Sequence, residues 1–380
     1  MISNTLEKWE EKTLGEILDK GSSNLSANKL NDCVGIYPVY GAGGLIAKVN
    51  FYQQDKEYLA IIKDGAGVGR VYHYQPKTSV LGTLQYLYPK PNTNIRFAYY
   101  YLQSIDFAKY YQGAAIPHIY YKDYKSEKLV LPPLPEQERI VAKLDEAFEA
   151  IDKVKVNAEQ NLTNAKELFE SALNKAFKKT DNIEQLKLDD IAEITSSKRI
   201  YKNEYSPFGI PFYRTKEIKE LAHNLPISLE LYISTDKYLE IKNKFGIPLQ
   251  NDLLISAVGT IGEIYIVQAN DKFYFKDGNI IWFRKYKKEI NAEYLKYCLT
   301  AFVKEIQNMT QGAAYNALTI EKLKEYKINV VNIKEQNVIV KKIKNIRNNI
   351  DKLEAIYTQK IKECDELKQS ILQKAFRGEL

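Results

Sequence analysis

The sequence predicts an α+β protein in which an antiparallel coiled coil of two long helices separates two globular domains of mixed strands and helices. Three observations lead to this prediction. The 380 residues exceed what one ordinary hydrophobic core accommodates. Segments of the first half return in the second half, which predicts an internal repeat with pseudo-two-fold symmetry. Each half also ends in a long stretch without Gly or Pro that carries heptad spacing.

The repeat is defined by three pairs of similar segments that lie 199 residues apart. These pairs are residues 112–115 with 311–314, residues 136–141 with 335–340, and residues 168–177 with 367–376. Nearer the N-terminus, Leu14–Ile17 and Leu188–Ile191 match at an offset of 174, so the second globular part is longer by about 25 residues. The sequence therefore predicts globular domains at residues 1–135 and 181–333, and long helices at residues 136–180 and 334–380.

Apolar residues at heptad spacing predict the faces along which the long helices pack. The residues expected in this packing interface include Leu144, Phe148, Ile151, Ile343, Ile350 and Ile371, with Leu353 and Leu367 in a second register of the later helix. Each apolar face needs a partner, and the other helix of the same chain has the highest effective concentration. A dimer of two chains through these helices is the alternative.

The start of the first long helix is marked by prolines. Residues 131–138 read Leu-Pro-Pro-Leu-Pro-Glu-Gln-Glu, which places three prolines before the helix and fixes an extended approach to it. Glu136 and Glu138 suit the positive end of the helix dipole. The second junction, residues 331–336, has no proline, so its helix start is predicted from the heptads alone.

Both globular parts contain short segments that are typical of strands. These segments are residues 58–63, 71–74, 84–88, 253–257, 263–267 and 279–284. Helices are expected at residues 96–111 and 292–310. A glycine-rich turn separates two expected strands in each part, at residues 64–70 and 257–263. Such a turn either brings backbone amides close to a phosphate or is a tight turn that needs positive φ.

Polar and basic residues near these turns, and in loops expected at residues 195–202 and 212–216, are candidates for nucleic-acid contacts. Arginine pairs with guanine through two hydrogen bonds, lysine binds phosphate, and smaller polar side chains contact either group. The candidates are Lys63, Arg70, His118, Tyr120, Lys122, Ser197, Lys198, Arg199, Tyr213, Arg214, Lys216, Thr260 and Asn316. A structural or solvated role is the alternative for each residue taken singly.

Composition and motifs narrow the function further. A formal net charge of +7 and 29 tyrosines permit a nucleic-acid partner. The sequence contains no Gly-x-x-x-x-Gly-Lys-[Ser/Thr] motif for phosphate binding and no Asn/Asp-Pro-Pro-aromatic motif for holding a flipped adenine. Three histidines and three scattered cysteines predict no metal site. Without a transmembrane or signal-peptide pattern, we expect a cytoplasmic binding protein that has no catalytic residue, metal or cofactor.

The combined pattern resembles the DNA-specificity subunits of type I restriction–modification systems over essentially the whole chain. The resemblance is carried by the Pro-Pro-Leu-x-Glu-Gln junction at residues 132–137, by Ala-Phe-Arg-Gly-Glu-Leu at residues 375–380, and by residues 210–218 and 259–262. The second junction departs from the family pattern because it lacks the prolines.

The resemblance implies that each globular domain is a target-recognition domain for one half of a split, asymmetric DNA sequence, and that the coiled coil is the spacer. It also implies partner subunits: two methylation subunits that modify adenines with S-adenosylmethionine, and restriction subunits that form the ATP-driven nuclease. Two other functions stay open, a coiled-coil adaptor without a DNA role and a nuclease or methyltransferase that acts alone. The repeat further predicts that residues 1–180 alone form a symmetric dimer.

Overall fold

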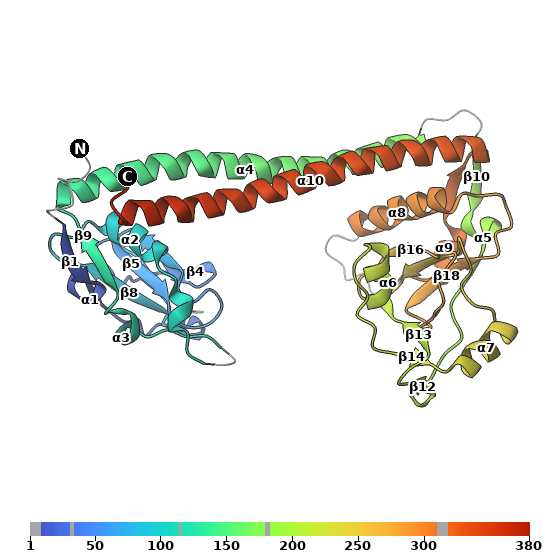
Figure 1. Ribbon diagram of the computed structural model, residues 1–380, viewed down its shortest axis with the longest axis horizontal. Helices are drawn as coiled ribbons and strands as arrows, with labels where there is room; N and C mark the ends of the chain where they lie inside the picture. The colour runs from blue at the N-terminus through green and yellow to red at the C-terminus, as the bar shows by residue number, and fades with distance from the viewer. Residues whose placement is uncertain (1–8, 31–33, 114–115, 179–182, 310–317) are drawn as a thin grey trace. The chain divides into compact units, whose positions relative to one another are not determined.

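The structure is a computed structural model that describes residues 9–30, 34–113, 116–178, 183–309 and 318–380. It divides into two compact units, and each unit contains part of both long helices (Figure 1). The first unit comprises residues 1–160 and 357–380, and the second comprises residues 161–356.

The first unit combines a globular domain with the start of α4 and the end of α10. Its strands are β1 (Glu10–Thr13), β2 (Leu18–Lys20), β3 (Tyr37–Gly41), β4 (Gly44–Val49), β5 (Tyr58–Ile62), β6 (Val71–Tyr74), β7 (Ser79–Val80), β8 (Leu84–Pro89) and β9 (Lys128–Leu131). Its helices are α1 (Leu14–Ile17), α2 (Ile95–Ser104), α3 (Tyr121–Tyr124) and the long α4 (Leu134–Lys178), with 3-10 turns η2 (Ala27–Lys29) and η3 (Phe107–Tyr110).

The second unit has the same order of elements with additions. Its strands are β10 (Glu184–Lys187), β11 (Glu193–Thr195), β12 (Tyr205–Ser206), β13 (Ile210–Tyr213), β14 (Tyr232–Ile233), β15 (Leu253–Ser256), β16 (Ile264–Ile266), β17 (Tyr274–Phe275), β18 (Ile280–Arg284) and β19 (Lys327–Val330). Its helices are α5 (Leu188–Ile191), the 3-10 turn η4 (Lys202–Glu204), α6 (Thr215–Ala222), α7 (Thr235–Lys244), α8 (Ala292–Met309), α9 (Ile320–Glu325) and the long α10 (Ile333–Phe376).

The sheet topology repeats between the two units, which confirms the internal repeat. The main sheet has the order β2-β8-β5-β6 in the first unit and β11-β18-β15-β16 in the second, and β1–β9 corresponds to β10–β19. A second sheet contains a parallel pair in each unit, β3 with β7 and β13 with β17. The extra residues of the second unit lie between β13 and β15 and include α6 and α7, while β14 pairs with β13 as β4 pairs with β3.

The central strands of the main sheets are fully buried. Every residue of β5 and of β15 is inaccessible to solvent, as expected of continuous apolar runs that are covered on both faces. Helices α2 and α8 pack against these sheets, with α2 contacting β5, β6 and β8, and α8 contacting β16. The six expected strands are confirmed, with ends that differ by at most one residue.

The two long helices pack antiparallel, which confirms the predicted coiled coil. In the first unit, residues from the start of α4 share a core with residues from the end of α10: Leu144, Phe148, Ile151, Cys364, Leu372 and Ala375. Ile371 packs against the edge of this core. In the second unit, Leu173 near the end of α4 shares a core with Ile343 near the start of α10. Ile350 is also buried.

Several sequence-based expectations need correction. The helix expected over residues 96–111 ends at Ser104 and is followed by the separate turn η3. The expected loop at residues 212–216 is instead the end of β13 followed by the start of α6. Leu353 and Leu367 of the second heptad register of α10 are exposed, whereas Ile339 of the same register is buried in the core of the second unit.

The junctions with the long helices also differ from expectation in detail. Helix α4 begins at Leu134, so Pro135 lies inside its first turn, where a missing N–H costs nothing. In the second junction, the side chain of Asn332 accepts a hydrogen bond from the backbone N–H of Glu335 at 3.0 Å. Asn332 therefore caps α10 where the first junction uses prolines.

Candidate nucleic-acid interface

Each unit contains a hairpin whose turn requires glycine for two reasons. Gly69, before β6, has a φ of +89°, and a Cβ there would lie 2.7 Å from Cβ of Phe107. Gly262, before β16, has a φ of +92°, and its Cβ would lie 2.3 Å from Cγ1 of Val303. Positive φ and close packing both exclude a larger residue. The first turn therefore packs against η3 and the second against α8.

In the first unit, the glycine turn lies beside the segment that contains His118. The backbone N–H of Ile119 donates to the carbonyl of Lys63 at 2.9 Å, and the N–H of Gly65 donates to the carbonyl of Pro117 at 3.1 Å. His118 and Gln112 exchange two backbone hydrogen bonds of 3.0 and 2.9 Å. Candidates that are about 50 residues apart in the sequence therefore share one surface.

We call this the glycine-turn surface and define it by Lys63, Arg70, His118, Tyr120 and Lys122. The ring of Tyr120 lies 4.9 Å from that of His118, and Nζ of Lys122 lies 5.3 Å from the Tyr120 ring centroid. Lys63 forms a long ion pair of 3.7 Å with its neighbour Asp64. Within the described part of the chain, Arg70 and Lys122 form no ion pair, so their charges are available to an anionic ligand.

In the second unit, the loop after β11 is tied to β17. The hydroxyl of Ser197 donates to the carbonyl of Phe275 at 2.7 Å, and the backbone N–H of Lys198 donates to the hydroxyl of Tyr274 at 2.7 Å. The Lys198 ammonium lies 5.4 Å from the ring centroid of Phe245. These bonds fix the loop backbone, and the hydroxyl hydrogen of Ser197 is already donated to a protein carbonyl.

Arg199 extends from the same loop and is oriented by a carboxylate. Its Nε donates to Oδ2 of Asp277 at 2.7 Å, and this hydrogen bond raises the pKa of Arg199. The side chain is 63% exposed, and its two terminal nitrogens are not used in that bond. A guanidinium held at Nε with its terminal nitrogens in solvent is arranged for a two-bond contact with a guanine or a phosphate.

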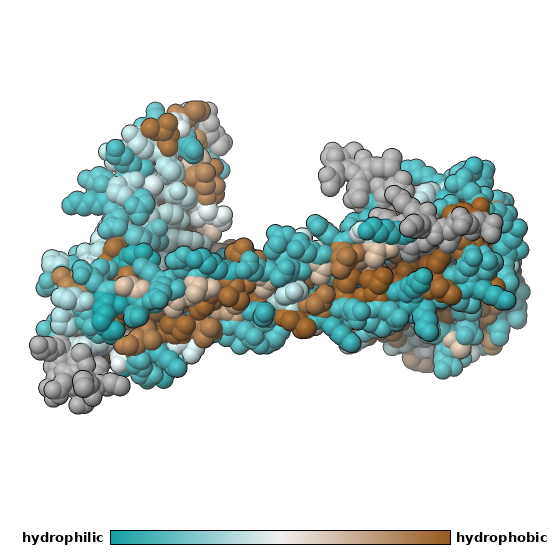
Figure 2. All heavy atoms as spheres, turned by 90° about the horizontal axis from the view of Figure 1, so that it is seen from above, coloured by the Kyte–Doolittle hydropathy of each residue, from teal (hydrophilic) through white to brown (hydrophobic). Residues whose placement is uncertain are grey.

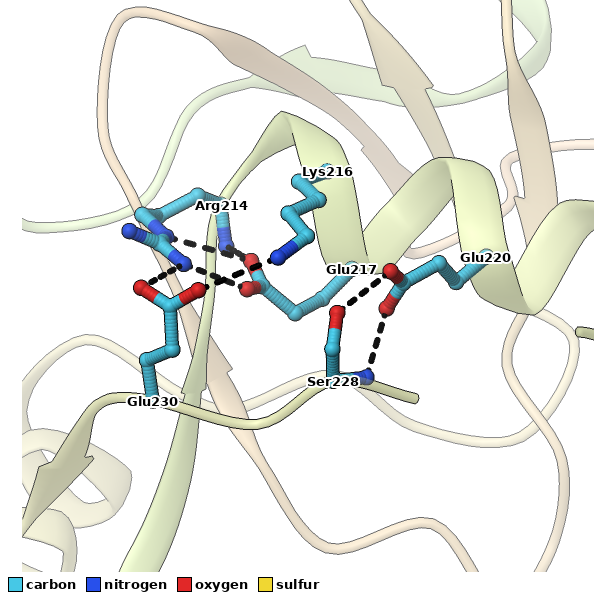
Figure 3. Close-up of polar contacts among 6 residues, drawn as sticks. All are labelled: Arg214, Lys216, Glu217, Glu220, Ser228 and Glu230. Atoms are coloured by element: carbon cyan, nitrogen blue, oxygen red, sulfur yellow. Dashed lines mark hydrogen bonds and ion pairs between the residues drawn. The ribbon is translucent and has the colours of Figure 1, made fainter. Parts of the chain in front are cut away.

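Arg214 and Lys216 form an internal ion-pair network (Figure 3). Arg214 donates to the buried carboxylate of Glu217 at 2.7 Å and to Glu230 at 2.9 Å, while Lys216 donates to Glu230 at 3.0 Å. Glu217 also accepts the backbone N–H of Arg214 at 2.7 Å and so caps α6. The hydrogen bond from Lys216, and to a smaller extent that from Arg214, lowers the pKa of Glu230. Nε and Nη2 of Arg214 are thus engaged inside the protein.

The other second-unit candidates lie in different environments. Tyr213 is buried and stacks on Phe273 with ring centroids 4.6 Å apart, so its side chain packs in the core. Thr260 is exposed at the tip of the glycine turn, and its carbonyl accepts the hydroxyl of Ser256. Asn316 lies outside the described residues, as do residues 114–115 and 311–314 of the sequence repeat.

Comparison with known proteins assigns the chain to a family. The sequence profile described as the type I restriction modification DNA specificity domain matches residues 6–163 and again residues 180–363. The chain belongs to this family. The two matched ranges each cover one copy of the internal repeat, so the chain carries two specificity domains.

Individual relatives agree with the family assignment. A putative type I restriction enzyme specificity subunit of Haemophilus influenzae is 27% identical over 80% of this chain and 79% of its own length. A putative specificity subunit of Methanocaldococcus jannaschii is 24% identical over 100% of this chain and 95% of its own length.

Solved structures share the fold. A chain of a type I restriction–modification system, solved in a study of complex assembly and conformational transition, is 18% identical and has a TM-score of 0.75, with 98% of both chains covered. The HsdS subunit of Thermoanaerobacter tengcongensis has a TM-score of 0.54 at 18% identity, covering 98% of this chain and 97% of its own.

The sequence-based prediction assigned no structural contact to two glutamines, Gln137 and Gln336, that attach the specificity domains to the long helices. Oε1 of Gln137 accepts the backbone N–H of Asn94 at 2.7 Å, and Oε1 of Gln336 accepts that of Asn291 at 2.8 Å. Both glutamine side chains are completely buried. The signal was present in the Glu-Gln repeat at an offset of 199, but spacing does not reveal the distant partner.

A second overlooked pair lies at the start of the smaller sheets. A Cβ at Gly35 would lie 2.1 Å from the backbone of Val49, and one at Gly209 would lie 2.4 Å from the carbonyl of Ile233. The residues before these glycines, Val34 and Phe208, are large, apolar and exposed. Both pairs stand 174 residues apart, the offset of Leu14 and Leu188, so the repeat already carried the signal.

Within the described residues, no helix has both the length and the apolar composition needed to cross a membrane. The same residues contain no group of three or more His, Cys, Asp or Glu side chains arranged to hold a metal ion.

Proposed function

We propose that this chain recognises a bipartite, asymmetric DNA target, with one half-site for each specificity domain, and directs adenine methylation or cleavage by partner subunits. The observation that carries the proposal is the double match to the DNA-specificity domain, at residues 6–163 and 180–363. The two domains share a topology but differ in their exposed side chains, which fits two different half-sites.

The candidate cations differ in how accessible they are to DNA. In the first domain, the glycine-turn surface offers Arg70 and Lys122 without competing carboxylates among the described residues, which supports phosphate and base contacts. In the second domain, Arg199 and Lys198 are the cations best placed to meet DNA. Contacts through Arg214 and Lys216 stay a prediction and would require displacement of Glu230.

The long helices are the proposed attachment site for methylation subunits, of which we propose two per chain. Figure 2 shows apolar side chains gathered along these helices. Large apolar residues exposed there are Val154, Leu168, Val338, Ile356 and Leu367. Exposed apolar residues that lie beside a coiled-coil interface favour further helical partners. Restriction subunits are proposed to join this complex, and we propose that the assembly acts in the cytoplasm without a membrane partner.

The proposal is tested by measuring DNA binding of the chain together with its methylation subunits at several salt concentrations. We expect an affinity that falls steeply with salt, because lysine and arginine contacts release counterions from DNA. Arg70→Ala or Lys122→Ala should each reduce the slope of log affinity against log salt by about 0.9. Lys153→Ala is the matched control, because Lys153 is exposed on α4 and pairs with Glu149 of the same helix.

The same preparation separates the alternatives. An adaptor without a DNA role gives no salt-dependent binding in the presence of methylation subunits. A nuclease or methyltransferase that acts alone gives cleavage with Mg²⁺, or methyl transfer with S-adenosylmethionine, from the isolated chain. We expect neither activity without the partner subunits.

A second experiment tests the helices as a spacer. Inserting one heptad into α4 and one at the paired position of α10 preserves the packing faces, because the insertion keeps the apolar repeat in phase. We expect methylome sequencing to show a changed spacer length between two unchanged half-sites. Altered half-sites would contradict the spacer role.

A further inference from the structure

The side chains that border the α4–α10 interface are distributed unequally between the two helices. In the first unit, Nζ of Lys368 lies 5.1 Å from the ring centroid of Phe148 and 2.6 Å from Oδ1 of Asp152. Nζ of Lys155 lies 2.7 Å from Oδ1 of Asp365. The aromatic ring thus comes from α4 and its cation from α10.

The second unit repeats this arrangement with different residues. The guanidinium of Arg347 on α10 lies 5.1 Å from the ring centroid of Phe169 on α4. In the 199-residue repeat, Arg347 occupies the position of Phe148, and Lys368 occupies the position of Phe169. Both rings therefore belong to α4 and both cations to α10, although the two helices belong to the same 199-residue repeat.

This unequal distribution predicts unfavourable contacts in a hypothetical pair of two α4 helices that keeps the register of the α4–α10 pair. The position of Asp365 is then occupied by Lys166, so Lys155 meets a lysine of the second copy. Phe148 meets Phe169 of the second copy, so neither ring has a cation. A pair of two α4 helices therefore exchanges an ion pair for a like-charge contact and loses both cation–π contacts.

A pair of two α10 helices brings together like charges of both signs. Arg347 meets Lys368 of the second copy, and Glu354, at the position of Lys155, meets Asp365. Asp351, at the position of Asp152, still faces Lys368 and retains one opposite-charge contact. Like charges replace the other contacts, so this pair is also disfavoured.

We propose that these bordering side chains make α4 and α10 selective for each other and disfavour the pairing of either helix with its own copy. The surface of α4 fits an α10-type helix, from the same chain or from another chain of this kind. The apolar heptad residues also differ between the helices, since Ala158, Ala165 and Ala172 of α4 match Tyr357, Cys364 and Ile371 of α10. The contribution of the bordering charges is therefore measured with variants that change charge and leave the apolar residues intact. The selectivity also changes the expectation for residues 1–180, whose self-association would place two Lys155–Lys166 contacts in one symmetric dimer.

The size of the effect follows from the number of contacts. One exposed ion pair or like-charge contact changes an equilibrium by about threefold. Because symmetry doubles each contact in a homotypic pair, we expect a preference of about tenfold for the mixed pair over the two homotypic pairs.

The test uses the full chain with a specific protease site inserted between α4 and β10, folded intact and then cleaved. Cleaved protein with normal isotopes is mixed with cleaved protein carrying heavy isotopes, and native mass spectrometry identifies the pairs. Exchange of labelled halves shows that pairing has equilibrated, and refolding from urea provides a second route to the same measurement. Without selectivity, the mixture contains one half mixed pairs and one quarter of each homotypic pair.

We expect mixed pairs to dominate in the unmodified sequence. Lys155→Glu should shift the ratio about tenfold toward pairs of first halves, because the introduced carboxylate would face Lys166 of a second copy and repel Asp365. Adding Asp365→Lys should restore the mixed pair. Lys153→Glu carries the same charge change outside the interface and should leave the ratio unchanged. A statistical mixture for the unmodified sequence, or an equal shift with Lys153→Glu, would overturn the proposal.

Discussion

The side chain of Gln137, buried at the start of α4, accepts the backbone N–H of Asn94 at the start of α2. Its amide nitrogen donates to the carbonyls of Asn92 and Pro132 at 2.9 and 2.8 Å. Asn94 in turn caps α2 by accepting from the backbone of Arg96 at 2.9 Å. One glutamine thereby joins the first specificity domain to the first long helix, and its counterpart Gln336 does the same in the second unit.

Replacing Gln137 with leucine should destabilise the first unit by about 2 kcal/mol, because one buried backbone group, the carbonyl of Pro132, and two partly buried ones, of Asn92 and Asn94, lose their partner. Gln336→Leu should have a similar effect on the second unit. The measurement is urea unfolding of the intact chain. Gln359→Leu is the control, since Gln359 is exposed on α10 and should change stability by less than about 0.5 kcal/mol. A Gln137→Leu protein as stable as the parent would show that the contact is dispensable.

An ion pair with exchanged polarity reinforces each of these joints. Arg96 on α2 and Asp145 on α4 lie 2.6 Å apart, and in the second unit Glu293 on α8 and Lys344 on α10 lie 2.6 Å apart. Asp145 and Lys344 occupy the same position of the repeat. Each specificity domain therefore carries, at this contact, the charge opposite to that of its own long helix.

Arg96→Glu should lower the stability of the first unit by about 1 kcal/mol, a modest value because both side chains are partly exposed. Combining it with Asp145→Lys recreates the polarity of the second unit and should recover most of the loss. Thermal unfolding of the single and double variants measures the coupling. Additive losses in the double variant would mean that the pair contributes no specific attraction.

Arg199→Ala should relax the sequence requirement in one half-site only. Its exposed terminal nitrogens are arranged for a two-bond contact, which is worth about 1–3 kcal/mol of discrimination at one base pair. Methylome sequencing with the methylation subunits present reports both half-sites at once. Arg70→Ala is the matched variant in the other domain and should affect the other half-site. Relaxation of the same half-site by both variants would contradict one-domain, one-half-site recognition.

Arg214→Ala should act mainly on stability. It leaves the carboxylate of Glu217 buried without its cation, which costs about 2 kcal/mol or more. We expect a lower unfolding temperature and unchanged half-sites below that temperature. A second change, Glu217→Gln, should reduce the loss because it removes the buried charge. A relaxed half-site with normal stability would instead assign Arg214 to the DNA contact.

Local patterns in the sequence determined the architecture of this protein. Heptad spacing placed both long helices to within four residues at each end, and alternating or continuous apolar runs located the strands of the main sheets. The repeat predicted two similar domains, and the additional residues of the second domain lie in its globular part, where they include α6 and α7. These features depend on residues that are near one another in the chain, so a linear pattern reveals them.

The tertiary structure alone decided which candidate side chains have partners. Arg199 and Asp277 are 78 residues apart, and Gln137 and Asn94 are 43 apart, so neither pair is visible in any local pattern. By sequence, Arg214 and Arg70 are equal candidates for a DNA contact, whereas folding brings two carboxylates to Arg214. A cation's availability depends on the charges that chain packing places around it, and long-range packing is what a one-dimensional pattern does not contain.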